Sequence, residues 1–210
     1  MYDLEEQEQI DALKAWWRQN ARLLIVAAVA AVAAAGAVSA WRYYKDNQAA
    51  QASQLYATLE KAMRAKDSKQ IKEVAAQLID KYGGTAYGAM AALAEAKADF
   101  DAGDLAGAGR RLEWAAEHGR DEEVRAVAQL RLAGVRLDEK KYDEALKLLE
   151  AKHPDAFAGM YADTRGDALL ALGKGTEAKA AYQLALDKLP PQSSYRLLVQ
   201  LKLDGLGGRK

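Results

Sequence analysis

The hydrophobic and polar residues of this chain form one long apolar run followed by a series of helical patterns. The run, LLIVAAVAAVAAAGAVSAW, extends from Leu23 to Trp41 without a charged residue, and Arg22 and Arg42 bracket it. At 1.5 Å per residue, a helix of this length spans about 28 Å, which is close to the thickness of the hydrocarbon core of a bilayer. The pattern therefore predicts a transmembrane helix over residues 23–41.

Aromatic residues gather at both ends of this run. Trp16 and Trp17 lie before it, and Tyr43 and Tyr44 follow it. Amphipathic rings in these places are typical of the two interfaces of a membrane helix. Two alternatives remain open, a buried alanine-rich core helix and a signal peptide cleaved near Val38-Ser39-Ala40. The residues expected to hold the anchor at the interfaces are Trp16, Trp17, Arg22, Trp41, Arg42, Tyr43 and Tyr44.

The charges around the run suggest its orientation. Lys14, Arg18 and Arg22 lie close to its N-terminal end, against Arg42 and Lys45 beyond its other end. Basic residues favour the cytoplasmic side, so this small excess predicts a cytoplasmic N-terminus. Residues 1–22 are then an acidic cytoplasmic tail, and residues 42–210 form a domain on the far side of the membrane.

Beyond Tyr44 the chain reads as amphipathic helices separated by short polar breaks, because apolar residues recur at i, i+3, i+4 and i+7. Asp67, Thr85, Asp104, Asp121 and Ser193 stand where N-caps are expected. The helices are predicted at residues 45–65, 68–82, 86–102, 105–118, 122–139, 142–152, 157–172, 175–188 and 194–204.

These helices follow an internal repeat. Ala108, Ala145 and Ala178 stand at equivalent places, 37 and 33 residues apart, near the tetratricopeptide period of 34. Small residues at Gly166 and Ala178 would let two antiparallel helices approach closely. We therefore expect an all-α protein in which an N-terminal transmembrane helix precedes a tetratricopeptide-like solenoid of helical hairpins, ending in a covering helix.

The first helix of each tetratricopeptide unit lines the concave surface, so its apolar residues are candidates for a protein-binding groove. The alternative is that the same side chains pack inside the solenoid core. Aligning the units on their alanines places Gly134 on this surface together with the candidate groove residues Met90, Leu93, Lys97, Phe100, Val127, Leu137, Met160, Asp163 and Asp167.

The amino-acid composition argues against several classes of function. Thirty basic residues balance thirty acidic ones, so the chain has no basic excess for nucleic acid. There is no cysteine, which excludes disulfides and thiolate metal sites. The two histidines, His118 and His153, lie at predicted helix C-termini and have no evident partners for a metal or a base role. We expect no catalysis, cofactor or metal, although a hydrolase with an unrecognised carboxylate pair stays open.

Several short motifs share their order with one family. They include Trp16-Trp17, Trp41-Arg42-Tyr43-Tyr44, Ala86-Tyr87-Gly88-Ala89, Gly103-Asp104-Leu105, Leu130-Arg131-Leu132-Ala133 and Ala162-Asp163-Thr164-Arg165-Gly166-Asp167. In these motifs the chain resembles the ancillary subunit of the bacterial Sec translocon, an inner-membrane protein with a periplasmic tetratricopeptide-like domain. The resemblance covers nearly the whole chain.

The resemblance implies a single-pass protein of the bacterial inner membrane with its C-terminal domain in the periplasm. It implies association with the Sec translocon and with a membrane-anchored, peptidyl-prolyl-isomerase-like periplasmic chaperone. Unfolded client proteins emerging from the channel are further possible partners. We therefore expect a membrane-tethered interaction and chaperone module. A scaffold subunit of another envelope complex, such as the division machinery, is the alternative.

Overall fold

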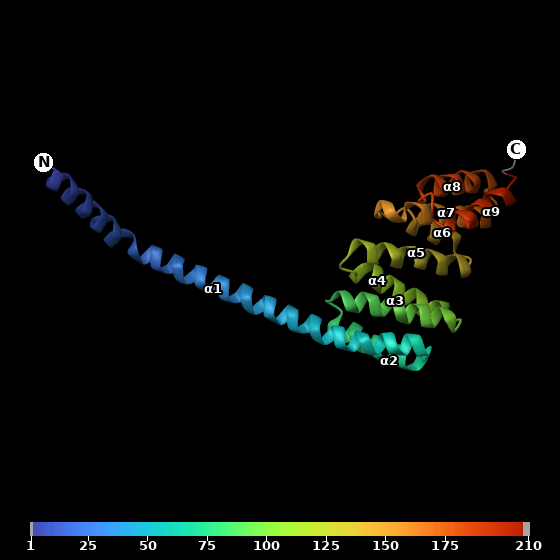
Figure 1. The fold of residues 1–210 in the computed structure, drawn as a ribbon, viewed down its shortest axis with the longest axis horizontal. Coiled ribbons are helices and arrows are strands. Elements are labelled where there is room, and N and C mark those ends of the chain that lie inside the picture. Colours follow the sequence, from blue (N-terminus) through green and yellow to red (C-terminus); the bar gives the residue numbers. More distant parts are fainter. Residues whose placement is uncertain (1, 208–210) are drawn as a thin grey trace. The chain divides into compact units, whose positions relative to one another are not determined.

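The computed structural model describes residues 2–207, and it describes side chains for residues 8–207 (Figure 1). Two compact units divide the chain, one up to Asn47 and one from Gln48 onward. In the first unit every residue from Tyr2 on is helical, and this helix, α1 (Tyr2–Ala65), continues into the second unit. The helix predicted separately at 45–65 is thus the end of α1, because no glycine or proline interrupts the chain there.

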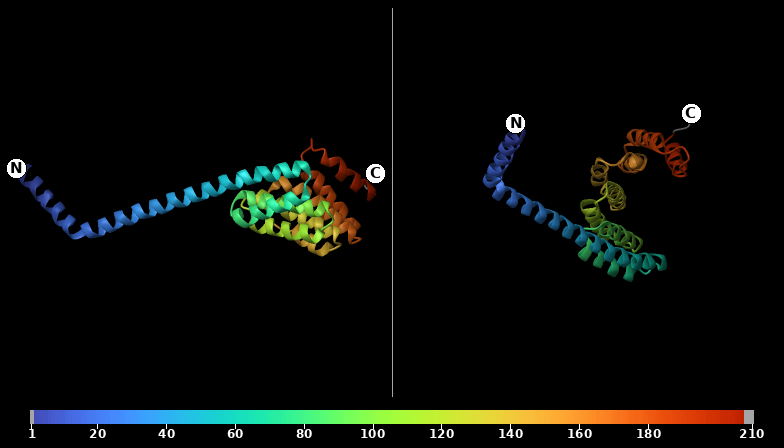
Figure 2. Two further views of the ribbon diagram at one scale, coloured as in Figure 1. Left: turned by 90° about the horizontal axis from the view of Figure 1, so that it is seen from below. Right: turned by 60° about the vertical axis from the view of Figure 1, so that its left-hand side comes forward.

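The second unit continues as a stack of helices, shown from two further directions in Figure 2. Most bounds agree with the prediction to within two residues. The exceptions are α6, which ends four residues early, and a short 3₁₀ helix before α7. The elements are α2 (Ser68–Tyr82), α3 (Ala86–Asp101), α4 (Leu105–His118), α5 (Glu122–Asp138), α6 (Tyr142–Leu148), η1 (Asp155–Phe157), α7 (Ala158–Ala171), α8 (Gly175–Lys188) and α9 (Tyr195–Gly205).

Four of the five predicted residues occupy the N-cap position of their helix, and two of them cap it with their side chain. The carboxylates of Asp67 and Asp104 accept hydrogen bonds from the backbone N–H groups three residues on, at 3.0 and 2.8 Å. Thr85 and Asp121 precede their helices without a side-chain cap. At α9 the capping position is Ser194, one residue after the predicted Ser193.

The repeat reappears in the backbone of the hairpin turns. Lys66, Gly103, Lys140 and Gly173 each have a positive φ between 55° and 81°. The residue after each of them donates a backbone hydrogen bond to the carbonyl five residues before it. This is the Schellman ending of a helix, and it occurs at equivalent places in all four hairpins. The structure thus confirms the repeat with an observation independent of side-chain similarity.

Small residues form much of the core between neighbouring helices. Gly166 on α7 shows why: a Cβ built there would lie 2.4 Å from the ring of Tyr182 on α8. Ala178, at the start of the same contact, is fully buried, as is Tyr182. Only a residue without a side chain allows α7 to sit directly against this ring, so the predicted close approach is confirmed.

Candidate protein-binding groove

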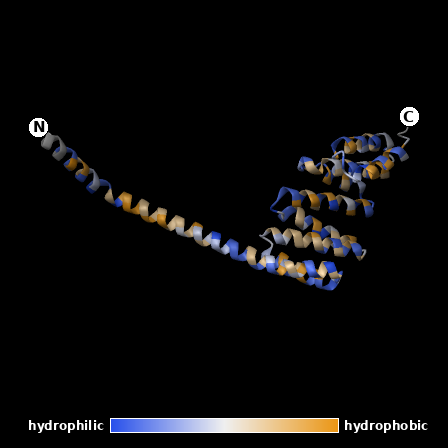
Figure 3. Cartoon of the chain, viewed as in Figure 1, coloured by the Kyte–Doolittle hydropathy of each residue, from blue (hydrophilic) through white to orange (hydrophobic). Residues whose placement is uncertain are grey.

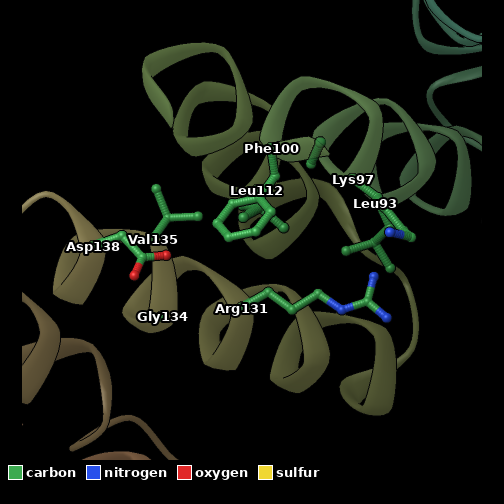
Figure 4. A pocket seen from close by; sticks show the side chains of 9 residues that line it. Leu93, Lys97, Phe100, Leu112, Arg131, Gly134, Val135 and Asp138 are labelled. Carbon is green, nitrogen blue, oxygen red and sulfur yellow. The ribbon is translucent and has the colours of Figure 1, made fainter. Parts of the chain in front are cut away.

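A groove of about 330 Å³ lies between α3 and α5 (Figure 4). Phe100 lies across its middle, 44% exposed, whereas Leu112 of α4 closes the bottom and is almost wholly buried. At Gly134 on α5, an added Cβ would meet no atom within 4 Å. The lining residues are Leu93, Ala96, Lys97, Phe100, Leu112, Arg131, Gly134, Val135 and Asp138.

A second hollow of about 210 Å³ adjoins this groove and shares Leu93, Lys97 and Arg131 with it. Met63 of α1 and Met90 of α3 supply flexible apolar side chains to its wall. Tyr56 completes that wall, with its ring 5.4 Å from the ring of Tyr87. The two hollows make one apolar surface that crosses three successive hairpins.

Most charged side chains near this surface are already paired. The Nζ of Lys97 lies 2.8 Å from a carboxylate oxygen of Asp101. Arg136, behind the groove, bonds Glu139 at 2.7 Å and also pairs with Glu113 and Glu144. The exceptions stand inside the groove.

Arg131 and Asp138 are those exceptions. Both are exposed, and neither has an ion-pair or hydrogen-bond partner among the residues described here. Sequence reasoning missed them, although Arg131, Gly134 and Asp138 follow the three-and-four spacing of one helix face. That spacing was the available signal.

The structure places the other predicted groove residues elsewhere. Val127 and Met160 are half-buried and line neither hollow. Leu137 packs against the core between α5 and α7, next to buried Ala133 and Leu149. Leu137 thus follows the alternative, in which apolar positions of the first helix of a unit serve the core.

Asp163 and Asp167, also predicted for the groove, lie under α9. Asp163 is 1% exposed, and both its oxygens lie 2.9 Å from the Nζ of Lys202. The same Nζ lies 2.7 Å from Asp167. Because α9 covers it, Asp163 offers no free surface to a partner, whereas Asp167 is paired with Lys202 and keeps 36% of its side chain exposed.

Two tyrosines complete this network. The hydroxyl of Tyr195 on α9 donates to Asp163, and the hydroxyl of Tyr182 donates to Asp167 at 2.8 Å. Burial, reinforced by these bonds to carboxylates, raises the pKa of both hydroxyls far above the usual value. The hydroxyls therefore stay protonated and keep donating over the whole physiological range.

Buried carboxylates elsewhere also have structural partners. On α3, Glu95 lies 3.0 Å from Arg111 of α4, and Asp99 lies 2.5 Å from Lys72 of α2. Burial raises the pKa of Glu95, whose second oxygen has no hydrogen-bond partner within the described chain. Each carboxylate faces a neighbouring helix of the stack, and within the described residues no cluster of three His, Cys, Asp or Glu could hold a metal ion.

The two histidines pack against aromatic rings. The ring of His118 stacks on Trp114 at 4.5 Å, and its Nδ1 lies 3.0 Å from the Trp114 carbonyl oxygen. The ring of His153 stacks on Tyr161 at 3.9 Å. His118 ends α4, as predicted, whereas His153 lies in the segment after α6, which ends at Leu148.

The predicted anchor is an exposed apolar stretch of α1, visible as an orange band in Figure 3. None of its most apolar 18-residue window is buried, and Val32 is 74% exposed. This exposure contradicts the alternative of a buried core helix. By length and composition, α1 can cross a membrane, and it fits a single-pass inner-membrane protein.

Side chains at the ends of this stretch make local contacts. The rings of Trp41 and Tyr44 lie 6.2 Å apart, and the Nζ of Lys45 lies 5.1 Å from the centre of the Trp41 ring. Before the stretch, the side chain of Asn20 donates to the backbone oxygen of Trp16 at 2.9 Å. Arg22, Arg42, Tyr43 and Trp17 are exposed.

Repeated hairpins with a common turn and a groove between first helices define a tetratricopeptide-like interaction domain. In agreement, the family model of the tetratricopeptide repeat-like domain matches residues 14–208. Three curated relatives carry the name ancillary SecYEG translocon subunit. The relative from Neisseria gonorrhoeae is 33% identical, covering 97% of this chain and 98% of its own. That from Haemophilus influenzae is 32% identical over 88% and 90%, and that from Escherichia coli 30% over 96% of both chains.

The chain therefore belongs to the family of ancillary SecYEG translocon subunits. Family and fold together point to a non-catalytic accessory subunit.

Proposed function

We propose that this protein is a membrane-tethered interaction module that binds the Sec translocon and holds apolar segments of proteins emerging from the channel. The observation that carries the proposal is the groove between α3 and α5, with exposed Phe100 over an apolar floor. A chain that has just crossed a membrane is unfolded and exposes such segments, which an apolar groove can shield.

The tether makes weak contacts sufficient. In our proposal residues 1–22 lie in the cytoplasm, residues 23–41 cross the inner membrane, and residues 42–210 lie in the periplasm. Anchoring at the channel raises the effective concentration of the groove near each emerging segment. Short contacts in a shallow groove then suffice, and release stays fast.

We propose a membrane-anchored, peptidyl-prolyl-isomerase-like chaperone as the second partner. A groove that releases its client quickly needs a second protein to accept that client. A chaperone anchored in the same membrane would be confined to the same plane and would therefore stay close to the groove. The resemblance of the motifs quoted above supports this pairing.

In-cell photocrosslinking tests the groove directly. A photoreactive phenylalanine analogue at Phe100 should form adducts with a stalled secretory chain that carries an apolar segment. The same analogue at Leu184, an exposed residue of α8, is the matched control. Adducts of equal yield from both positions would contradict the proposal.

A blocking variant sharpens this test. Gly134→Leu extends a side chain into the groove from a position where an added Cβ meets nothing within 4 Å, and it should reduce the Phe100 adducts several-fold. Gly175→Leu adds the same side chain at an open helical glycine of α8 and should leave them unchanged. Equal yields of Phe100 adducts in the two variants would exclude the groove as the site that holds the nascent chain.

A further inference from the structure

The two uncompensated charges of the groove lie at its opposite ends. Figure 4 shows Arg131 at one end and Asp138 at the other, with Phe100 and Val135 between them. Both belong to α5, seven residues apart, which corresponds to about 10.5 Å along the helix axis. The groove therefore has a positive end, an apolar middle and a negative end.

Arg131 and Asp138 differ from the neighbouring charged residues, which have partners within the protein. Arg125, on the same helix, donates to the backbone oxygens of Gly119 and Arg120. Arg136 is shared by three carboxylates, and Lys97 on the opposite wall is paired with Asp101. Arg131 and Asp138 are thus the lining charges that a bound segment can still satisfy.

The floor between these ends admits the backbone of an occupant. Gly134 lies between Arg131 and Asp138 on the same helix face, and an added Cβ there would project into open space. A chain in the groove can approach α5 closely at this point. A chain in the extended polyproline II conformation advances about 3.1 Å per residue with three residues per turn. Side chains three residues apart therefore lie on one side of it and about 9 Å apart, which is close to the distance between the two charges.

We infer that the groove binds extended apolar segments in one direction, with an acidic side chain at Arg131 and a basic side chain about three residues away at Asp138. The apolar residues between them pack on Phe100 and Val135. This inference rests on the proposed function and names the kind of segment that the groove prefers. Charge complementarity at both ends selects this occupant, because turning the same segment around in the groove places like charges against each other.

The expected preference is modest. Exposed ion pairs contribute little individually, so two favourable pairs against two repulsive ones give about a tenfold difference in Kd between the two directions. The difference should shrink as salt rises from about 0.02 M to about 0.5 M, because both ends are open to solvent.

The test uses the full chain in detergent micelles and two fluorescent peptides of identical composition. Both carry aspartate, two leucines and lysine in that order between neutral residues, with a photoreactive group beside the aspartate in one and beside the lysine in the other. Mass spectrometry of the adducts should place the first peptide about tenfold more often at the Arg131 end of the groove than at the Asp138 end, and the second peptide the other way round. The double variant Arg131→Asp with Asp138→Arg should exchange the two ends, and circular dichroism checks that it is folded.

The outcomes separate the two claims. If Gly134→Leu abolishes binding of both peptides but neither direction is preferred, the groove stands and the directional inference is overturned. If the charge swap leaves the preference unchanged, the inference is also overturned. If Gly134→Leu leaves binding intact, the groove itself is not the site and the proposed function fails with it.

Discussion

In the region of α3 and α5, the first helices of two units leave a groove open between them, whereas at the C-terminal end α9 covers the first helix of the last unit. The same repeat positions serve both regions. Leu93 and Lys97 line the groove, and the equivalent residues 70 positions later are Asp163 and Asp167. There the side chains are acidic, and α9 supplies Lys202 and Tyr195 to meet them.

The difference teaches what a repeat position means. In a solenoid each unit contacts mainly its neighbours, so a given position is surface or core according to the element that follows it. Where no helix covers the position, an apolar or unpaired side chain remains available to a partner. Where a terminal helix covers it, the same position carries a group that fixes that helix in place.

The largest expected effect is the loss of stability when the paired cation Lys202 is removed, compared with removal of the exposed cation Arg131. Lys202→Met removes the partner of two carboxylates, one of them 1% exposed, and should lower the free energy of unfolding by about 3 kcal/mol. Arg131→Met in the groove, without a described partner, should change it by less than about 0.5 kcal/mol. Urea denaturation of the full chain in micelles measures both, and equal effects would show that α9 is not held by this network.

Two glycines at neighbouring repeat positions should respond in opposite directions. Gly166→Ala places a methyl group 2.4 Å from the Tyr182 ring and should destabilise by about 2 kcal/mol. Gly134→Ala meets nothing within 4 Å and should stabilise by about 1 kcal/mol, because alanine is the better helix former. The midpoints of thermal unfolding provide the readout; a stabilised Gly166→Ala protein would mean that α7 and α8 can separate without cost.

Much of this fold could be predicted because it follows from local patterns in the sequence. The apolar run predicted the transmembrane helix, and the alanine spacing and the glycines of the turns predicted the repeat, its helices and the close contact at Gly166. The family came from the resemblance of short motifs. Lys66 and Lys140 show the limit of that approach. They occupy the left-handed turn position that Gly103 and Gly173 fill elsewhere, and a lysine gives no such signal in the sequence.

The groove could be predicted only in part, because elements far away in the sequence decide which helix faces stay open. Leu93, Lys97 and Phe100, chosen by repeat position, line the groove, and their contact with a bound protein stays a prediction. Asp163 could not be, since its burial depends on a helix whose Lys202 lies 39 residues further along the chain. Whether a charged residue on a helix face meets solvent or a buried partner is decided by that distant element.

Removing one hydroxyl from the covered end should have a smaller effect than removing its cation. Tyr195→Phe loses the hydrogen bond to Asp163, and the expected loss is about 1.5 kcal/mol because the acceptor is charged. Tyr87→Phe is the control near the groove, where the ring packs on Tyr56 and no hydroxyl bond is found within the described part of the chain. If the control loses as much stability, ring packing rather than the hydrogen bond accounts for the effect.

The smallest effect comes from one hydroxyl group at the junction between the two regions, and its contribution to stability should change only at alkaline pH. Tyr161 of α7 donates to the backbone oxygen of Ala126 on α5 at 2.9 Å, and burial raises its pKa from 10 to about 12. An unfolded chain loses this proton near pH 10 and the folded chain only near pH 12, so unfolding releases a proton in between. The stability that the hydroxyl contributes is therefore complete below pH 10 and is lost as pH rises towards 12.

Tyr161→Phe isolates that contribution, because every other titrating group is common to both proteins. The wild type should exceed the variant by about 1 kcal/mol at neutral pH, for one neutral hydrogen bond. This lead should shrink between pH 10 and 12. Paired urea denaturation curves at pH 7 and at several values above 9.5 measure it. A lead that stays constant to pH 12 would mean that the pKa of Tyr161 is the same in the folded and the unfolded chain, and that burial between α5 and α7 does not raise it.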